Sequence, residues 1–203
     1  GAFHPGESDG APPGTGTLVL LGPDGPGFWD RFRASPEAAD GDADPLDRWS
    51  LRVIGAIAAA LGAVPLFPFG GPPWAPFIAW ALPSGHAWSS PVGPLVHARL
   101  GLFVSYRGAL ALPARLDLTA PPARRCETCG RPCLAACPVG ALSGSGYDVA
   151  ACHRFLDTAA GADCLGRGCA VRRACPVGAT LRAEAQSAFH MASFHGKRSA
   201  CDA

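Results

Sequence analysis

The spacing of apolar residues in the first half of the chain predicts one long amphipathic helix. Between residues 45 and 61, apolar side chains recur every three or four positions, which places them on one helical face. Asp44 is a favourable N-cap, Pro45 suits the first helical position, and Gly62 is a typical terminator. A helix is therefore expected over Pro45–Leu61.

Shorter apolar runs on either side predict further helices and strands. Thr17–Leu21 is a candidate for a buried strand, because a Gly- and Pro-rich turn follows it directly. The other expected elements are helices at 28–34, 76–82 and 92–100, a strand at 64–69, and a hairpin of 102–106 with 109–112. Because strands and helices interleave, residues 1–118 are predicted to form a small α+β or α/β domain, with a Pro-rich linker at 119–123.

The apolar stretches are too short to predict a membrane-spanning segment. Residues 53–67 form the longest of them, and Pro65 interrupts it. A transmembrane helix needs about 20 apolar residues, so no membrane span is expected. The N-terminal residues also lack the pattern of a secretory signal peptide. We therefore expect a cytoplasmic protein.

All nine cysteines lie from Cys126 onward, and a repeated hexapeptide divides most of them into two series. Ala-Cys-Pro-Val-Gly-Ala occurs at 136–141 and again at 174–179, and each copy closes a series of cysteines. The first series is Cys126, Cys129, Cys133 and Cys137, and the second is Cys152, Cys164, Cys169 and Cys175. Closely spaced cysteines that end in Cys-Pro are typical of bacterial ferredoxins with two [4Fe–4S] clusters. Residues 124–203 are therefore predicted to form a dicluster ferredoxin-like module.

The rule for such ferredoxins also predicts which cysteines share a cluster. The cysteine of each Cys-Pro pair ligates the cluster of the other series, which ties the two halves together. The first cluster is then held by Cys126, Cys129, Cys133 and Cys175. The second cluster is held by Cys137, Cys152, Cys164 and Cys169. Cys201 is left over in a polar tail and is not expected to be a ligand.

The spacings depart from the usual ferredoxin series and leave a second kind of metal site open. Three residues rather than two separate Cys129 from Cys133, and eleven separate Cys152 from Cys164. Zinc sites with four cysteines also begin with C-x2-C, so zinc is the alternative. Zinc sites do not require two Cys-Pro endings, which favours iron–sulfur clusters. An odd number of cysteines without secretory features disfavours a disulfide scaffold.

Charge divides along the chain at the same place as the cysteines. Residues 1–120 carry 7 Lys+Arg and 10 Asp+Glu, net −3, whereas residues 121–203 carry 10 and 6, net +4. Two oxidised [4Fe–4S] cores with four thiolates each add about −4. The excess of arginine is therefore interpreted as cancelling the charge of the clusters, and a nucleic-acid partner is disfavoured.

The cysteine pattern between residues 124 and 180 resembles the iron–sulfur module of epoxyqueuosine reductases. In that family, an isolated cysteine on a helix supplies one ligand of the second cluster. Cys152, in Ala-Ala-Cys-His-Arg-Phe-Leu, occupies the matching place. The resemblance implies the same division of ligands as the Cys-Pro rule. It also implies a module that carries electrons to a larger reductase.

The first half of the chain lacks features that the family uses for catalysis. The family uses a corrinoid and an aspartic acid that acts as general acid, whereas no Asp or Glu lies between Asp47 and Asp117 here. This region is also shorter than the family's cobalamin domain. We therefore expect a diverged relative that transfers electrons to a redox partner protein. The alternative is a reductase whose clusters feed a substrate, corrinoid or flavin bound by the N-terminal domain.

Two further sets of residues are candidates for a functional role. His153 directly follows a predicted ligand and is a candidate to hydrogen-bond a cluster sulfur, although it also suits a polar helix face. An aromatic-rich segment is a candidate to line a pocket for a flat ligand, although aromatic clusters more often form core. Its residues are Trp74, Trp80, His86 and Trp88.

Overall fold

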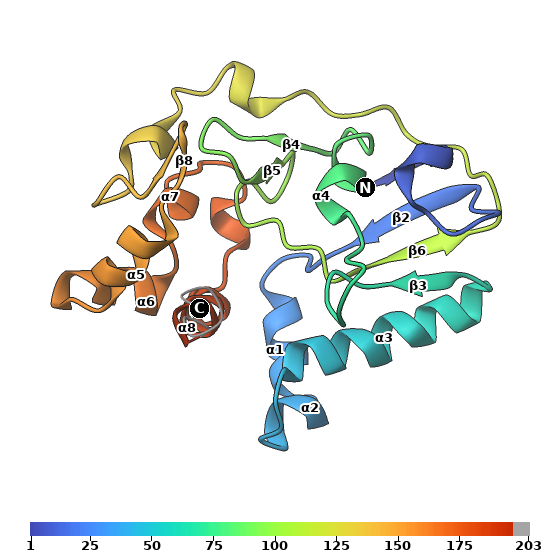
Figure 1. The fold of residues 1–203 in the computed structure, drawn as a ribbon, viewed down its shortest axis with the longest axis horizontal. Helices are drawn as coiled ribbons and strands as arrows, with labels where there is room; N and C mark the ends of the chain where they lie inside the picture. The colour runs from blue at the N-terminus through green and yellow to red at the C-terminus, as the bar shows by residue number, and fades with distance from the viewer. Residues whose placement is uncertain (197–203) are drawn as a thin grey trace. The chain divides into compact units, whose positions relative to one another are not determined.

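The computed structural model describes residues 1–196 and divides the chain into two compact units (Figure 1). Unit 1 contains residues 1–88 and 104–123. Unit 2 contains residues 89–103 together with the chain from residue 124 onward. The sequence-based division assigned 89–103 to the N-terminal domain, because this segment contains no cysteine. The structure groups it with the cysteine-bearing segment instead.

Unit 1 is built on a four-stranded sheet with the order β1-β2-β6-β3. The strands are β1 (Ala2–Phe3), β2 (Thr17–Leu21), β3 (Val64–Leu66) and β6 (Gly108–Leu112). Every neighbouring pair is antiparallel, so this unit belongs to the α+β class rather than to the α/β class. The overall fold is mixed α+β, and the ferredoxin-like character of unit 2 stays a prediction.

The expected hairpin of 102–106 with 109–112 is wrong, whereas the expected strand at Thr17–Leu21 is confirmed. Strand β6 lies between β2 and β3 and pairs with both, with Leu110 opposite Val19 on one side and opposite Pro65 on the other. Residues 109–111 are buried, which is the environment of a central strand. Its partners are therefore distant in sequence, and a local hairpin signal could not identify them.

Helix α3 (Pro45–Leu61) has the predicted bounds and packs against the sheet. Ile54 and Ala58 form a buried cluster with Leu110 of β6, and Figure 1 shows α3 running alongside β3. Burying a side chain such as Ile54 contributes roughly 1.5–3 kcal/mol. Asp44 occupies the N-cap position in a left-handed conformation, and its side chain makes no capping hydrogen bond.

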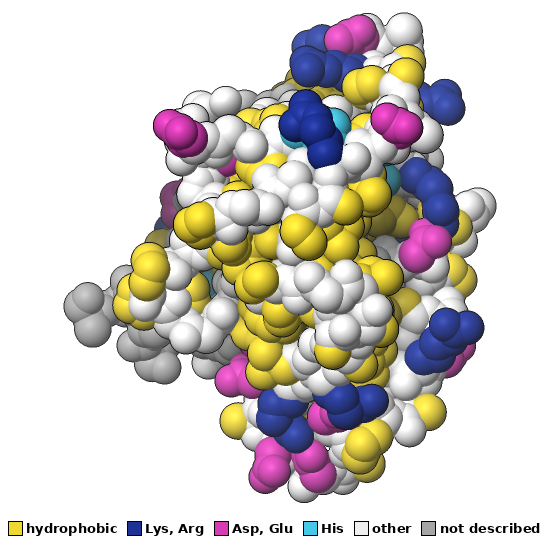
Figure 2. All heavy atoms as spheres, turned by 90° about the vertical axis from the view of Figure 1, so that its right-hand side faces the viewer, with side chains coloured by type: hydrophobic (Ala, Val, Ile, Leu, Met, Phe, Trp, Pro, Cys, Tyr) yellow, Lys and Arg dark blue, Asp and Glu magenta, His cyan; other side chains and the backbone are white. Residues whose placement is uncertain are grey.

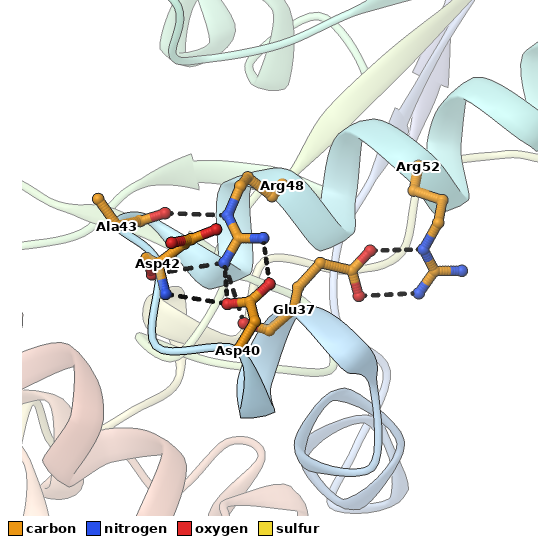
Figure 3. Close-up of polar contacts among 6 residues, drawn as sticks. All are labelled: Glu37, Asp40, Asp42, Ala43, Arg48 and Arg52. Carbon is orange, nitrogen blue, oxygen red and sulfur yellow. Dashed lines mark hydrogen bonds and ion pairs between the residues drawn. The ribbon is translucent and has the colours of Figure 1, made fainter.

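Charged side chains join the beginning of α3 to the short helix before it. Helices α1 (Gly27–Arg33), α2 (Pro36–Ala39) and α4 (Phe77–Ala81) complete the helices of unit 1. Arg52 donates two hydrogen bonds to Glu37 of α2, at 2.5 and 3.0 Å, and Arg48 donates to both carboxylate oxygens of Asp40 (Figure 3). The hydrogen bonds from Arg52 lower the pKa of Glu37 to about 2.

The surface of unit 1 carries exposed apolar side chains around the turn from α3 to β3. Leu61 and Val64 flank this turn and are 56% and 50% exposed. Figure 2 shows the face on which the turn lies, where hydrophobic side chains spread across the centre and charged ones surround them. In residues 1–196, no helix combines the length and the apolar character needed to cross a bilayer.

Unit 2 consists of short elements joined by turns. Its strands are β5 (Leu95–His97), β7 (Leu142–Ser143) and β8 (Gly146–Tyr147), and β4 (Ala87–Ser89) lies at the boundary between the units. Its helices are α5 (Val149–Leu156), α6 (Ala162–Arg167), α7 (Ala170–Arg173) and α8 (Glu184–Gly196). The helix expected at 92–100 is wrong, because Gly93 adopts a positive φ, Pro94 follows it, and β5 forms instead.

Candidate metal centre

Four cysteines from distant parts of unit 2 form a first set. Cys126 lies on the 3₁₀ turn η2 (Arg125–Glu127), Cys129 lies in the bend after it, and Cys133 lies on η3 (Pro132–Ala135). Cys175 follows Ala174, the C-cap residue of α7, and α7 contacts η3. Burial raises the pKa of Cys133, and the thiolates of the other three cysteines raise it further. The structure therefore brings together the four cysteines that the Cys-Pro rule assigns to the first cluster, and their role as ligands stays a prediction.

The backbone closes tightly around this first set. The amide of Arg131, a residue in the left-handed conformation, donates a 3.3 Å hydrogen bond to the sulfur of Cys129. On the other side, Gly101 has φ +57°, and a Cβ atom there would lie 2.9 Å from the Cys175 sulfur and 2.2 Å from the Val177 carbonyl oxygen. Residues 89–103 therefore help to enclose the set, although they contain no cysteine.

A second set of four cysteines lines one pocket of unit 2. Cys152 projects from α5, Cys164 from α6 and Cys169 from the N-cap of α7, and Cys137 precedes Pro138. The pocket is small, about 30 Å³, and its other lining residues are mostly apolar. These are the four cysteines that the Cys-Pro rule assigns to the second cluster. Their ligation is again a prediction that the structure does not test.

A hydroxyl group that sequence reasoning missed contacts this second set. Burial raises the pKa of Cys152, and the thiolates of the other three cysteines act in the same direction. Tyr147 opposes them, because its hydroxyl lies beside the Cys152 sulfur and favours the thiolate, which lowers the pKa of Cys152. Tyr147 ends β8, and Asp148 caps α5 by accepting a 2.8 Å hydrogen bond from the Ala151 amide. The hairpin and the cap together place the hydroxyl beside Cys152.

An aromatic stack from α8 covers α5 next to the second set. The ring of Phe194 stacks on Tyr147 and on His153, with centroid separations of 6.1 and 4.4 Å. His153 also stacks on His195. Nδ1 of His153 is buried and has no hydrogen-bond partner within residues 1–196. The described ring contacts of His153 are with α8, and its hydrogen bond to a cluster sulfur stays a prediction.

A buried guanidinium lies close to the second set. The Nε atom of Arg172 donates a 2.6 Å hydrogen bond to the carbonyl of Leu102, and its guanidinium stands over the ring of Phe103. Burial lowers the pKa of Arg172, and the thiolate of Cys169 partly offsets this effect. A cation in this position is consistent with the interpretation that arginine balances negative charge in unit 2.

The donor set of each group fits the chemistry of an iron–sulfur cluster. All eight described cysteines are free thiols, and each set supplies four of them. Within residues 1–196, no three His, Cys, Asp or Glu side chains are placed to hold one metal ion between them. Ligands of one zinc ion sit about 2.3 Å from it, whereas a [4Fe–4S] cluster takes its four thiolates on four different irons. Cys201 lies outside the described residues.

The aromatic residues predicted to line a pocket differ widely in exposure. Trp80 and Trp88 are buried at 1% and 5% exposure, whereas Trp74 is 62% exposed. Trp80 packs against Phe77 and donates its indole N–H to the carbonyl of Asp9. Burial lowers the pKa of His86, and the positive charge of the N-terminal amine lowers it further. The burial of Trp80 and Trp88 favours a packing role for both residues.

In comparisons with known proteins, no family model, no curated protein and no solved structure matches this chain significantly. The cysteine arrangement is therefore the basis for a functional interpretation.

Proposed function

We propose that this protein carries two [4Fe–4S] clusters and transfers electrons. The proposal rests on one observation: the eight described cysteines gather in unit 2 as two sets of four, and each set mixes the two series. Cys175 joins the first series, and Cys137 joins the second. This exchange of the Cys-Pro cysteines is the ligation pattern of two-cluster ferredoxins.

The residues around each set would hold the thiolates and adjust their charge. When bound, the clusters supply one-electron transfer. The amide of Arg131 donates a hydrogen bond to the Cys129 sulfur, and the hydroxyl of Tyr147 lies beside the Cys152 sulfur. Hydrogen bonds to thiolate ligands shift reduction potentials. Arg172 adds a buried positive charge beside Cys169. The residues that line the second pocket around its cysteines are mostly apolar.

The proposal also covers the family relationship of the protein and its cellular compartment. The pattern supports a diverged, shorter relative of the electron-carrying module of epoxyqueuosine reductases, acting with a redox partner protein. Cysteine-rich metal sites in which the eight described cysteines are free thiols fit a reducing, cytoplasmic compartment. The lack of any carboxylate between Asp47 and Asp117 gives no support to the family's reductase chemistry in unit 1.

Metal and sulfide analysis of anaerobically purified protein tests the proposal. We expect about eight iron and eight acid-labile sulfide per chain. Cys152→Ala should lower both to about half, because the first set is left complete. Cys201→Ala is the matched control and should retain both clusters. Stoichiometric zinc without labile sulfide would overturn the proposal.

A binding experiment separates an electron carrier from a reductase. Cobalamins and flavins are titrated into the anaerobic protein, and binding is followed by absorbance. An electron carrier should bind none of them. Saturable binding that His86→Ala abolishes would instead indicate a reductase with a ligand in unit 1.

A further inference from the structure

A hollow lined by arginine lies in unit 2, next to the start of α8. Its volume is about 260 Å³, and none of the described residues that line it is a cysteine. The lining residues are Arg167, Arg173, Ala179, Arg182, Glu184 and Ser187. Three of these six residues carry a guanidinium, so the hollow has the side chains of an anion-binding site.

Main-chain carbonyls hold two of the guanidinium groups in place. Arg173 donates from Nε to the Gly168 carbonyl at 2.9 Å, and Arg182 donates from Nη1 to the Arg173 carbonyl at 2.8 Å. The guanidinium of Arg182 also stands over the ring of Phe103. A ligand that binds here therefore meets donors that are already ordered, which lowers the entropic cost of binding.

Each arginine keeps hydrogen-bonding capacity after these contacts. No acceptor is described within residues 1–196 for Nη2 of Arg167, Nη1 of Arg173 or Nη2 of Arg182. The carboxylates of Asp163 and Glu184 form ion pairs with these arginines. Three guanidinium groups and two carboxylates together carry one net positive charge. A guanidinium carries five N–H donors, so the remaining ones can bind further oxygen atoms.

The first turn of α8 adds to the positive character of the hollow. Glu184 and Ser187, which line it, belong to this turn, and α8 is 13 residues long. The first backbone amides of a helix have no acceptor within the helix, and the helix dipole places partial positive charge there. The arginines and the helix terminus are thus two independent features that favour an anion at the same place.

We propose that this hollow binds the phosphate or diphosphate group of a small molecule. Arginine matches phosphate oxygens with paired N–H donors, and phosphate groups commonly bind at helix N-termini. Pockets for whole drug-sized ligands span about 300–1,000 Å³, so this volume suits the phosphate part of a ligand. A nucleic-acid strand would instead need a positive groove that follows several phosphates.

Calorimetric titration of the intact chain tests this site, and its outcome does not depend on which metal unit 2 holds. The probes are inorganic phosphate and pyrophosphate, with sodium chloride at the same ionic strength as the reference. We expect saturable binding at a single site, tighter for pyrophosphate. Arg167→Gln should weaken binding about tenfold, because one guanidinium is lost.

A second variant avoids the hydrogen bonds that the arginines make to the backbone. Ala179 is exposed in the lining, so Ala179→Glu places a carboxylate in the hollow and should abolish binding. Arg154 is an exposed arginine of α5 that does not line the hollow, and Arg154→Gln is the matched control that should leave binding unchanged.

Three results would overturn the proposal. The first is the absence of saturable binding of either probe. The second is an equal loss of affinity in Arg154→Gln and Arg167→Gln, which would indicate a general charge effect. The third is tighter binding of single-stranded RNA than of pyrophosphate, weakened by changes at Arg124 and Arg131 but not by Ala179→Glu. That result would indicate a nucleic-acid surface. Arg124 and Arg131 are exposed residues of unit 2 that do not line the hollow.

Discussion

The two units of this chain are stabilised by different means. In unit 1, a sheet and a long helix enclose large side chains such as Leu18, Phe32 and Trp80, all less than 3% exposed. In unit 2, the buried apolar residues of the described part include no aromatic side chain, and three of the ten are the cysteines Cys133, Cys164 and Cys175. In unit 2, cysteines thus occupy buried positions of the kind that large apolar side chains occupy in unit 1.

This difference indicates how the two units acquire stability. A unit with a continuous apolar core folds through burial of that core. A small unit with a sparse core generally needs disulfides or metal, and all eight described cysteines are free. We therefore expect that unit 1 folds without a cofactor and that unit 2 folds only when its cysteines bind one.

Withdrawal of iron should produce the largest effect. We expect that protein prepared without iron and sulfide loses hydrogen-exchange protection across unit 2, to values near those of an unfolded chain. Unit 1 should keep its protection, because none of its residues is a predicted ligand. All five tryptophans lie in unit 1, so their fluorescence offers a second measurement. Equal protection of unit 2 with and without iron would contradict this comparison.

A substitution that leaves a cavity in the core of unit 1 should destabilise unit 1 and leave unit 2 unaffected. Ile54→Ala removes a buried side chain from the cluster with Leu110 and should destabilise unit 1 by about 2–5 kcal/mol. Urea titration followed by tryptophan fluorescence measures this change. Ile57→Ala, at a 40% exposed position of the same helix, should change stability by less than about 0.5 kcal/mol. Iron content should stay constant in both variants, and its loss would show that unit 2 depends on unit 1.

A single methyl group at Gly101 should affect the first set of cysteines alone. Ala tolerates the left-handed conformation poorly, and its Cβ would collide with the Val177 carbonyl and the Cys175 sulfur. We expect Gly101→Ala to lower the iron content from about eight to about four per chain. Gly93→Ala is the control, because Gly93 also has a positive φ but a Cβ there would meet no atom within 4 Å. Loss of iron in both variants would show that backbone strain, rather than the collision with Val177 and Cys175, causes the effect.

The role of Gly101 also shows what the sequence could and could not predict. The bounds of α3 follow from local information, because its periodicity, Pro45 and Gly62 all lie within one segment. The division of the cysteines into two ligand sets was predicted from the Cys-Pro rule for two-cluster ferredoxins, and it stays a prediction. Local patterns did not reveal that residues 89–103 belong to unit 2 or that β6 pairs with β2 and β3. Both depend on partners that are distant in sequence.

The spacing of the cysteines in the sequence also could not predict which other side chains lie next to them. Tyr147 lies five positions before Cys152, and only the hairpin and the capped helix bring its hydroxyl to the sulfur. Arg172 was counted as part of a net charge, but its burial beside Cys169 depends on Leu102 and Phe103. A ligand motif specifies the donors, whereas the tertiary structure specifies what surrounds them.

Removal of the Tyr147 hydroxyl should shift the potential of the second cluster while leaving the cluster bound. A hydrogen bond to a thiolate sulfur stabilises the reduced, more negative state, so Tyr147→Phe should lower the potential. A bond of about 1 kcal/mol corresponds to roughly 40 mV for one electron. Anaerobic redox titration followed by EPR measures the shift. Tyr106→Phe, in unit 1, is the control, and a similar shift in both variants would contradict a direct effect on the sulfur.

The smallest effect should come from the ion pair between α2 and α3, and it should be confined to unit 1. Hydrogen bonds from Arg52 lower the pKa of Glu37 from 4.5 to about 2. The stabilisation is therefore fully present above about pH 4.5 and is lost as the pH falls toward 2. Glu37→Gln should remove this pH dependence, measured by urea titration with tryptophan fluorescence between pH 2 and 6. Glu7→Gln, at an exposed position of unit 1, should retain it, and equal pH profiles for the two variants would show that another group is responsible.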